Sequence, residues 1–75
     1  MEAIVKVWFE DNRIYILTDP GNTYSRSLKA FPLLRRATAE QRALYEIGQD
    51  GDDIHWEDID EDIHISSFFV TAERN

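Results

Sequence analysis

The sequence predicts a small α+β protein of two layers, and three observations lead to this fold class. Residues 3–27 contain three extended segments separated by two turn sequences. Residues 32–44 carry helix-start signals in place of the strand pattern. Short extended segments return after Tyr45. Because 75 residues leave room for only one hydrophobic core, we expect a single domain over residues 1–75.

The first half predicts an N-terminal three-stranded antiparallel meander. The segment 3–10 alternates between two faces. We expect one face to hold Val5, Val7 and Phe9, and the other to hold Ile4, Lys6, Trp8 and Glu10. Asp11-Asn12 suits a two-residue hairpin turn before a second strand over residues 13–18. Pro20-Gly21 suits a bend before a third strand over residues 23–27.

The middle of the chain predicts two short helices. Pro32 fits the first position of a helix, where its missing N–H costs nothing. Thr38 and Gln41 have the spacing of a capping box, in which each side chain bonds the other residue's backbone amide. We therefore expect a second helix from Ala39 to about Leu44.

The last third predicts a C-terminal hairpin. Residues 45–48 and 53–56 read as strands joined by a turn at Asp50-Gly51. Ile54 and Trp56 fall on one strand face, so we expect Trp56 in the core rather than at an exposed interface.

A short terminal turn is expected after the hairpin. Ile63 and Ile65 read as one more extended piece. We expect Ser66 to cap a turn that buries Phe68 or Phe69, and residues 71–75 to fray.

The charge of the chain is concentrated in one run between positions 50 and 62. The run has no Lys or Arg, while the rest of the chain is slightly positive, so it accounts for the whole net charge of −7. Its acidic residues are Asp50, Asp52, Asp53, Glu57, Asp58, Asp60, Glu61 and Asp62. Apolar residues threaded through the run predict that a core holds these carboxylates in fixed places.

Segregated negative charge attracts a basic partner and repels nucleic acid. We therefore expect the eight acids to bind the basic surface of a nucleic-acid-binding protein, with no direct nucleic-acid binding by this chain. The alternative is that the acids only keep the protein soluble. For Asp60 alone we favour a structural role in a turn.

Metal binding and catalysis are poorly supported, and we expect no cofactor, no metal and no catalytic residue. The loop at Asp50 does not fit calcium-loop spacing, because Ile54 stands where a third ligand belongs. His55 and His64 lack a ligand spacing, and we expect surface histidines whose pKa neighbouring acids raise. No nucleophile elbow surrounds Ser66.

Composition also bears on location and oligomeric state. The absence of Cys fits a reducing compartment, and no segment resembles a signal peptide or a membrane span. We therefore expect a cytoplasmic protein without membrane contact, as a monomer or a weak homodimer.

Two other surfaces are candidates for contact. Trp8 and Tyr15, with Ile4 and Leu17, are expected on an exposed strand face that forms a second interface, unless the segment 68–70 folds back over it. A small positive face, or ion pairs with nearby acids, is expected from the bases Lys29, Arg35, Arg36 and Arg42.

Two motifs resemble those of the small bacterial proteins grouped as domain of unknown function 2442. They are L-L-R-R-A-T-A-E-Q-R in the middle and D-I-H-W-E-D-I-D-E-D-I near the end. The matching residues are Leu33, Leu34, Ala37, Thr38, Gln41, Arg42, Ile54, Trp56, Asp60, Glu61, Asp62 and Ile63. This chain departs at Glu57, where the family usually has Pro, and at residues 50–53, where the family is less charged.

The resemblance implies a small α+β sandwich without an established enzymatic activity. Many members look like the antitoxin half of toxin–antitoxin pairs, and one member type resembles the anti-CRISPR inhibitors of the type I-C system. Together with the charge, this leads us to expect a non-enzymatic DNA mimic, anti-CRISPR-like, that inhibits a defence complex. The alternative is an antitoxin that neutralises a basic toxin.

Overall fold

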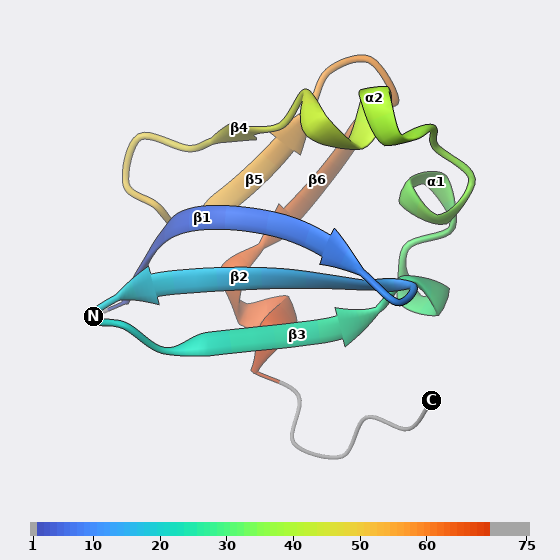
Figure 1. The fold of residues 1–75 in the computed structure, drawn as a ribbon. Coiled ribbons are helices and arrows are strands. Elements are labelled where there is room, and N and C mark those ends of the chain that lie inside the picture. The colour runs from blue at the N-terminus through green and yellow to red at the C-terminus, as the bar shows by residue number, and fades with distance from the viewer. Residues whose placement is uncertain (1, 70–75) are drawn as a thin grey trace.

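The computed structural model describes residues 2–69 and contains two three-stranded antiparallel sheets that face each other (Figure 1). The first sheet consists of β1 (Ala3–Glu10), β2 (Arg13–Asp19) and β3 (Thr23–Ser27). The second consists of β4 (Glu46–Ile47), β5 (Asp53–Trp56) and β6 (Glu61–His64). The predicted α+β class and N-terminal meander are confirmed, and the predicted hairpin is part of a larger sheet.

Short helical segments connect and close the two sheets. The 3₁₀ turn η1 (Leu28–Ala30), the helix α1 (Pro32–Arg35) and the helix α2 (Ala39–Ala43) link β3 to β4, and the 3₁₀ turn η2 (Ile65–Phe68) follows β6. Figure 1 shows both α-helices at the same end of the molecule. None of the helices within residues 2–69 is long and apolar enough to span a membrane.

The helix-start predictions are confirmed. Pro32 occupies the first turn of α1. At α2, the Gln41 amide donates to the Thr38 hydroxyl at 3.0 Å, and the Thr38 amide donates to the Gln41 side chain at 2.9 Å. This capping box satisfies two amides that the five-residue helix could not pair internally.

The β1–β2 turn is also as predicted. Asp11 and Asn12 have φ values of 51° and 62°, the left-handed conformations that a two-residue hairpin turn requires. Both residue types tolerate this region better than most others. The turn therefore sets the pairing of β1 with β2 from Glu10 and Arg13 outward.

The predicted face of Val5 and Ile4 was wrong, because a bulge interrupts β1. The pairing with β2 shifts between Ile4 and Lys6, so Val5 is an extra residue and side chains before it change face. Ile4 is 3% exposed and faces the core, whereas Val5 is 54% exposed. The bulge lets the Ile4 amide donate to the Gly51 carbonyl at 2.7 Å, which joins the two sheets.

Gly51 meets this junction at close range. A Cβ at position 51 would lie 2.7 Å from the Cβ of Ala3, and the φ of 73° is in the left-handed region. Both constraints require glycine at this position.

The core lies between the sheets. It is built from buried side chains of both, together with one residue each of η1 and α1 and two of η2. They are Ile4, Val7, Ile14, Ile16, Leu28, Leu34, Ile54, Trp56, Ile63, Ile65 and Phe68. Strand alternation explains the contribution of β2, in which Ile14, Ile16 and Thr18 are buried and the intervening residues are not.

The end of the described chain differs in detail from the prediction. Ile65 starts η2 instead of extending a strand, and the cap is His64 rather than Ser66. The His64 Nδ1 accepts the Ser66 amide at 3.1 Å, a role that a ring nitrogen can fill as a hydroxyl would. Phe68 is buried as expected, and the predicted fraying of residues 71–75 lies outside the described residues.

Candidate acidic interface

The eight acids, which we call the acidic surface, lie on β5, on β6 and on the loops at their two ends. Asp50 and Asp52 are in the loop before β5, and Glu57, Asp58 and Asp60 are in the turn between β5 and β6. Six of the eight are exposed, and Asp53 and Glu61 are half-buried. The fold therefore keeps the predicted run together as one region of surface.

Buried neighbours hold this surface in place. Ile54 and Trp56 of β5 are 0% exposed, and Ile63 of β6 is 2% exposed. The Trp56 indole N–H donates to the Arg42 carbonyl at 3.1 Å, which satisfies its one polar group. Trp56 is thus a core residue, as the sequence predicted.

Because the strands alternate, the residues between these anchors face outward. His55 pairs with Asp62 across the sheet, and Asp53 pairs with His64. The His55 Nδ1 lies 2.7 Å from an Asp62 carboxylate oxygen. Its hydrogen bond to Asp62, together with the charges of Asp62, Glu57 and Glu46, raises the pKa of His55 above its ordinary value, as expected for a surface histidine among acids.

The second histidine also lies among carboxylates. The His64 Nε2 is 3.9 Å from an Asp52 carboxylate oxygen, while its Nδ1 is occupied by the cap of η2. No group of three or more His, Cys, Asp or Glu side chains within residues 2–69 is arranged to hold a metal ion.

Two acids of the β5–β6 turn also have structural roles. Asp60 has a φ of 53°, so its backbone supplies the left-handed residue of the turn, in line with the structural role expected for it. Asp58 accepts a hydrogen bond of 3.1 Å from the Gln41 side-chain amide of the capping box. This bond ties the acidic turn to α2 and fixes the position of the Asp58 carboxylate.

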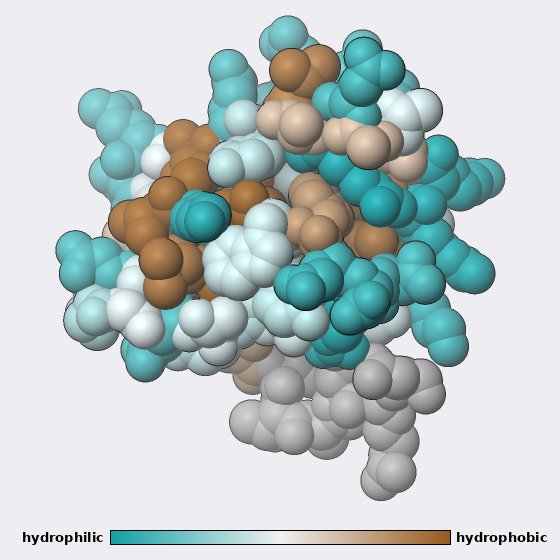
Figure 2. All heavy atoms as spheres, viewed as in Figure 1, coloured by the Kyte–Doolittle hydropathy of each residue, from teal (hydrophilic) through white to brown (hydrophobic). Residues whose placement is uncertain are grey.

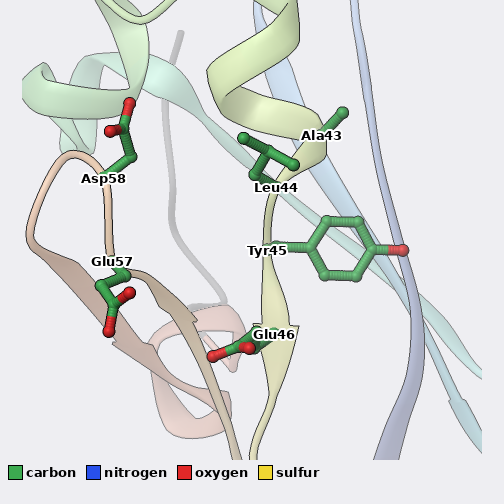
Figure 3. A pocket seen from close by; sticks show the side chains of 6 residues that line it. All are labelled: Ala43, Leu44, Tyr45, Glu46, Glu57 and Asp58. Atoms are coloured by element: carbon green, nitrogen blue, oxygen red, sulfur yellow. The ribbon is translucent and has the colours of Figure 1, made fainter.

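A groove adjoins the turn and extends the acidic surface beyond the predicted run. It is lined by Ala43, Leu44, Tyr45, Glu46, Glu57 and Asp58. Figure 3 shows Glu46 reaching this space from β4 and Glu57 from the turn. Sequence reasoning missed Glu46 because it lies outside the run; its place opposite His55 in the β4–β5 pairing is the signal that would have found it.

The expected basic face in the helical middle loses one member. The Arg42 guanidinium donates to the Leu34 carbonyl at 2.9 Å and to the Arg35 carbonyl at 3.0 Å, and it lies 5.4 Å from the centre of the Phe9 ring. Arg42 therefore holds α1 and α2 together, whereas Arg36 is exposed.

The expected second interface lies on the outer face of the first sheet. The Trp8 and Tyr15 rings stack with centroids 5.4 Å apart, and the Lys6 ammonium lies 5.5 Å from the Trp8 ring centre. Both rings are half-buried. Figure 2 looks onto this face and shows hydrophobic and pale residues gathered over β1 and β2, with hydrophilic residues around them.

The membership of this face differs from the prediction, and the alternative cover is not formed by residues 68 and 69. Ile4 does not belong to it, because the bulge turns Ile4 into the core. Phe68 is buried in the core, and Phe69 packs edge-on against Tyr24, which pairs with the inward-facing Ile16. Within the described residues, the C-terminal segment therefore lies on the core side and not over Trp8, and Val70 is outside them.

One polar cluster had no sequence signal. The Glu2 carboxylate accepts hydrogen bonds from the Thr18 hydroxyl at 2.6 Å, the Asn22 side chain at 2.8 Å and the Tyr24 hydroxyl at 2.5 Å. These donors lower the pKa of Glu2, with Thr18 the largest cause. The cluster fastens the start of β1 across the first sheet.

These features define a small antiparallel α+β sandwich with one acidic sheet. The chain matches the family model described as "Protein of unknown function (DUF2442)" over residues 4–72, and it belongs to this family. Neither the curated proteins nor the solved structures yield a match to it.

Proposed function

We propose that this protein is a non-enzymatic inhibitor whose acidic surface occupies the basic nucleic-acid-binding surface of a partner protein, as a mimic of DNA. The form we favour is anti-CRISPR-like, in which the partner is a defence complex that must engage target DNA. The observation that carries the proposal is the placement of the eight acids on a buried framework.

The spacing of the carboxylates suits this role. Acids stand at both ends of β5 and β6, which are roughly 10–13 Å apart at a strand rise of about 3.3 Å per residue. Duplex DNA presents one phosphate charge per roughly 1.7 Å of its axis, so a basic groove built for DNA meets several charges over such a length. The carboxylates of the acidic surface span a length comparable with the stretch of DNA that carries several phosphates.

Rigidity makes the charge more effective. The side chains of Ile54, Trp56 and Ile63 are buried, so the strand backbone that carries the acids is fixed before binding. A preorganised surface loses less conformational entropy on binding than a flexible acidic tail. Long-range attraction between opposite charges also speeds association with a basic partner.

Exposure argues for docking over chemistry. A catalytic carboxylate works best in a site that excludes water. Asp52, Asp58 and Asp62 are instead open to solvent. For this reason the proposal contains no reaction.

The test is capture of partners from a lysate on immobilised protein, eluted with salt and, separately, with a DNA duplex. The neutralised variant carries Asp58→Asn, Asp60→Asn, Glu61→Gln and Asp62→Asn. We expect it to lose capture by at least about tenfold, and DNA to displace the partner from the wild type. Elution by salt is expected because exposed charges are screened over about 8–10 Å near physiological ionic strength.

A variant of equal charge provides the control. It neutralises four exposed acids of the first sheet and α2, through Glu10→Gln, Asp11→Asn, Asp19→Asn and Glu40→Gln. Both variants lose four negative charges from a formal net charge of −7, so only the location differs. Equal capture by the two variants, or a partner that DNA does not displace, would contradict the proposal. Capture of a toxin instead of a defence complex would favour the antitoxin alternative.

A further inference from the structure

Two grooves adjoin the short segment Ala43–Tyr45, which we call the ridge; Ala43 and Leu44 are exposed and Tyr45 is half-buried. One is the acidic groove already described. The other is mainly apolar and is lined by Val7, Trp8, Phe9, Ala39, Arg42, Ala43 and Tyr45. Both are lined by Ala43 and Tyr45, so the two grooves adjoin. Residues of β1 and β4, which are edge strands of their sheets, contribute to the two linings.

Successive side chains of the ridge serve the two grooves. Leu44 lines the acidic groove with Glu57 and Asp58, and Figure 3 shows Tyr45 pointing away from those two residues, toward the strands of the first sheet. Leu44 is 64% exposed, more than any other large hydrophobic side chain within residues 2–69. A single exposed leucine is ordinary on a protein surface, so its relevance here comes from its place beside the carboxylates that line the same groove.

The negative charges beside the ridge favour a positively charged side chain of a partner. Glu46, Glu57 and Asp58 face the Leu44 side of the ridge. The one base in the lining of either groove is Arg42, whose guanidinium is bound to the carbonyls of Leu34 and Arg35. Its donors are thus directed at the protein itself, and the acidic groove keeps its negative charge.

Side chains that combine a cationic head with an apolar stem match the acidic groove. The stem of Arg or Lys packs on an exposed aliphatic side chain while the head group reaches carboxylates. An apolar side chain matches the other groove, where Trp8, Phe9 and Tyr45 supply aromatic walls.

We propose that an extended segment of the basic partner crosses this ridge, with an apolar side chain in the groove of Trp8 and Tyr45 and an Arg or Lys in the groove of Glu46, Glu57 and Asp58. This inference rests on the proposed function and names the contact by which such a partner is selected. Side chains two residues apart on an extended chain lie about 7 Å apart on one face, so such a segment can direct one side chain toward each of the two adjoining grooves.

The test is titration of the 75-residue protein with short peptides, monitored by proton–nitrogen correlation NMR. The probe is acetyl-Gly-Phe-Gly-Arg-Arg-Gly-amide. One comparison peptide replaces Phe with Ala, and another replaces both Arg with Gln. We expect the probe to shift the amide signals of Leu44 and Tyr45, and each comparison peptide to bind at least about fivefold more weakly.

Variants locate the contact on the protein. Leu44→Ser and Glu57→Gln change exposed side chains, so both should fold, and each should weaken binding of the probe at least about fivefold. Val5→Ser alters another exposed apolar residue, outside both grooves, and should leave binding unchanged.

Equal binding of the three peptides, signal shifts confined to other regions, or equal effects of Leu44→Ser and Val5→Ser would overturn the inference. The proposed function fails by a different result, namely partner capture that survives neutralisation of residues 58–62. If capture is lost on neutralisation but Leu44→Ser captures the partner as the wild type does, only the ridge contact is refuted.

Discussion

The two sheets of this protein differ in strand length and in the charge of their outer faces. The strands of the first sheet have eight, seven and five residues, and those of the second have two, four and four. Outward positions of the first sheet include the half-buried rings of Trp8 and Tyr15, while outward positions of the second hold Asp62 and its neighbours. The strands of the second sheet are short, so this sheet depends strongly on the core beneath it. The acids therefore lie on the sheet with the shorter strands, and burial of Trp56 and its neighbours stabilises that sheet.

The strongest test of this dependence is Trp56→Ala. Removing a fully buried indole should cost about 3–5 kcal/mol, comparable with the whole stability expected of a domain this small. We expect that the cooperative thermal unfolding transition, monitored by circular dichroism, is lost.

Trp8→Ala is the matched control on the first sheet, because Trp8 is half-buried and faces outward. It should unfold at a temperature much closer to that of the wild type. If the two variants melt alike, the second sheet does not depend on Trp56 as we infer.

Thr38→Ala sharpens the comparison at the link between the sheets. It removes the cap of α2, and we expect a cost of about 1 kcal/mol in the free energy of unfolding measured with urea. The same capping box positions Gln41, which bonds Asp58, so local order of the acidic turn should fall as well. Thr23→Ala, an exposed threonine of β3, is the control and should change the midpoint little. An unaltered urea midpoint for Thr38→Ala would mean that the cap contributes nothing.

The pH dependence of stability should have opposite sign in the two sheets. In the first sheet, Glu2 should make the protein less stable as pH falls. The pKa of Glu2 is lowered in the folded state, so its contribution is complete above the ordinary value of 4.5 and is lost as pH falls through the folded pKa. Melting temperatures measured from pH 6 downward should therefore fall less for Glu2→Gln than for the wild type. Parallel curves would show that the Glu2 cluster adds no pH-dependent stability.

In the second sheet, His55 should make the protein less stable as pH rises. The pKa of His55 is raised, so its contribution is complete below the ordinary value of 6.5 and is lost as pH rises through the folded pKa. This effect is expected to be the smallest, because both partners are partly exposed and the pair is screened. The His55 ring signals in proton NMR should titrate above pH 6.5 in the wild type and return toward that value in Asp62→Asn. A midpoint that Asp62→Asn does not move would contradict the pairing.

Local chemistry made much of this fold predictable. The turn at Asp11-Asn12 and the capping box at Thr38 depend on residues close together in sequence, and the burial of Trp56 follows from alternation along one strand. The acidic run was visible because its members are contiguous.

One remaining feature depends on a contact that sequence spacing does not reveal. The bulge at Val5 accompanies the burial of Ile4 and its bond to Gly51 of the β4–β5 loop. Neither alternation nor motif spacing shows that these distant segments meet. Glu46 was missed for another reason: the predicted hairpin already implied its pairing with His55, but the charge run was counted only from Asp50.

The bond between Ile4 and Gly51 also bears on the order in which the molecule forms. Contacts within each sheet join strands that follow one another in the chain, and such local contacts close with a small loss of chain entropy. The Ile4–Gly51 bond instead connects the beginning of the chain with its last third, so docking of the sheets is the entropically costly step. An unfolding intermediate that keeps the first meander would have its full complement of negative charge but no fixed array. The acids should therefore take up their fixed positions only when the two sheets dock, at the junction where Gly51 meets Ile4.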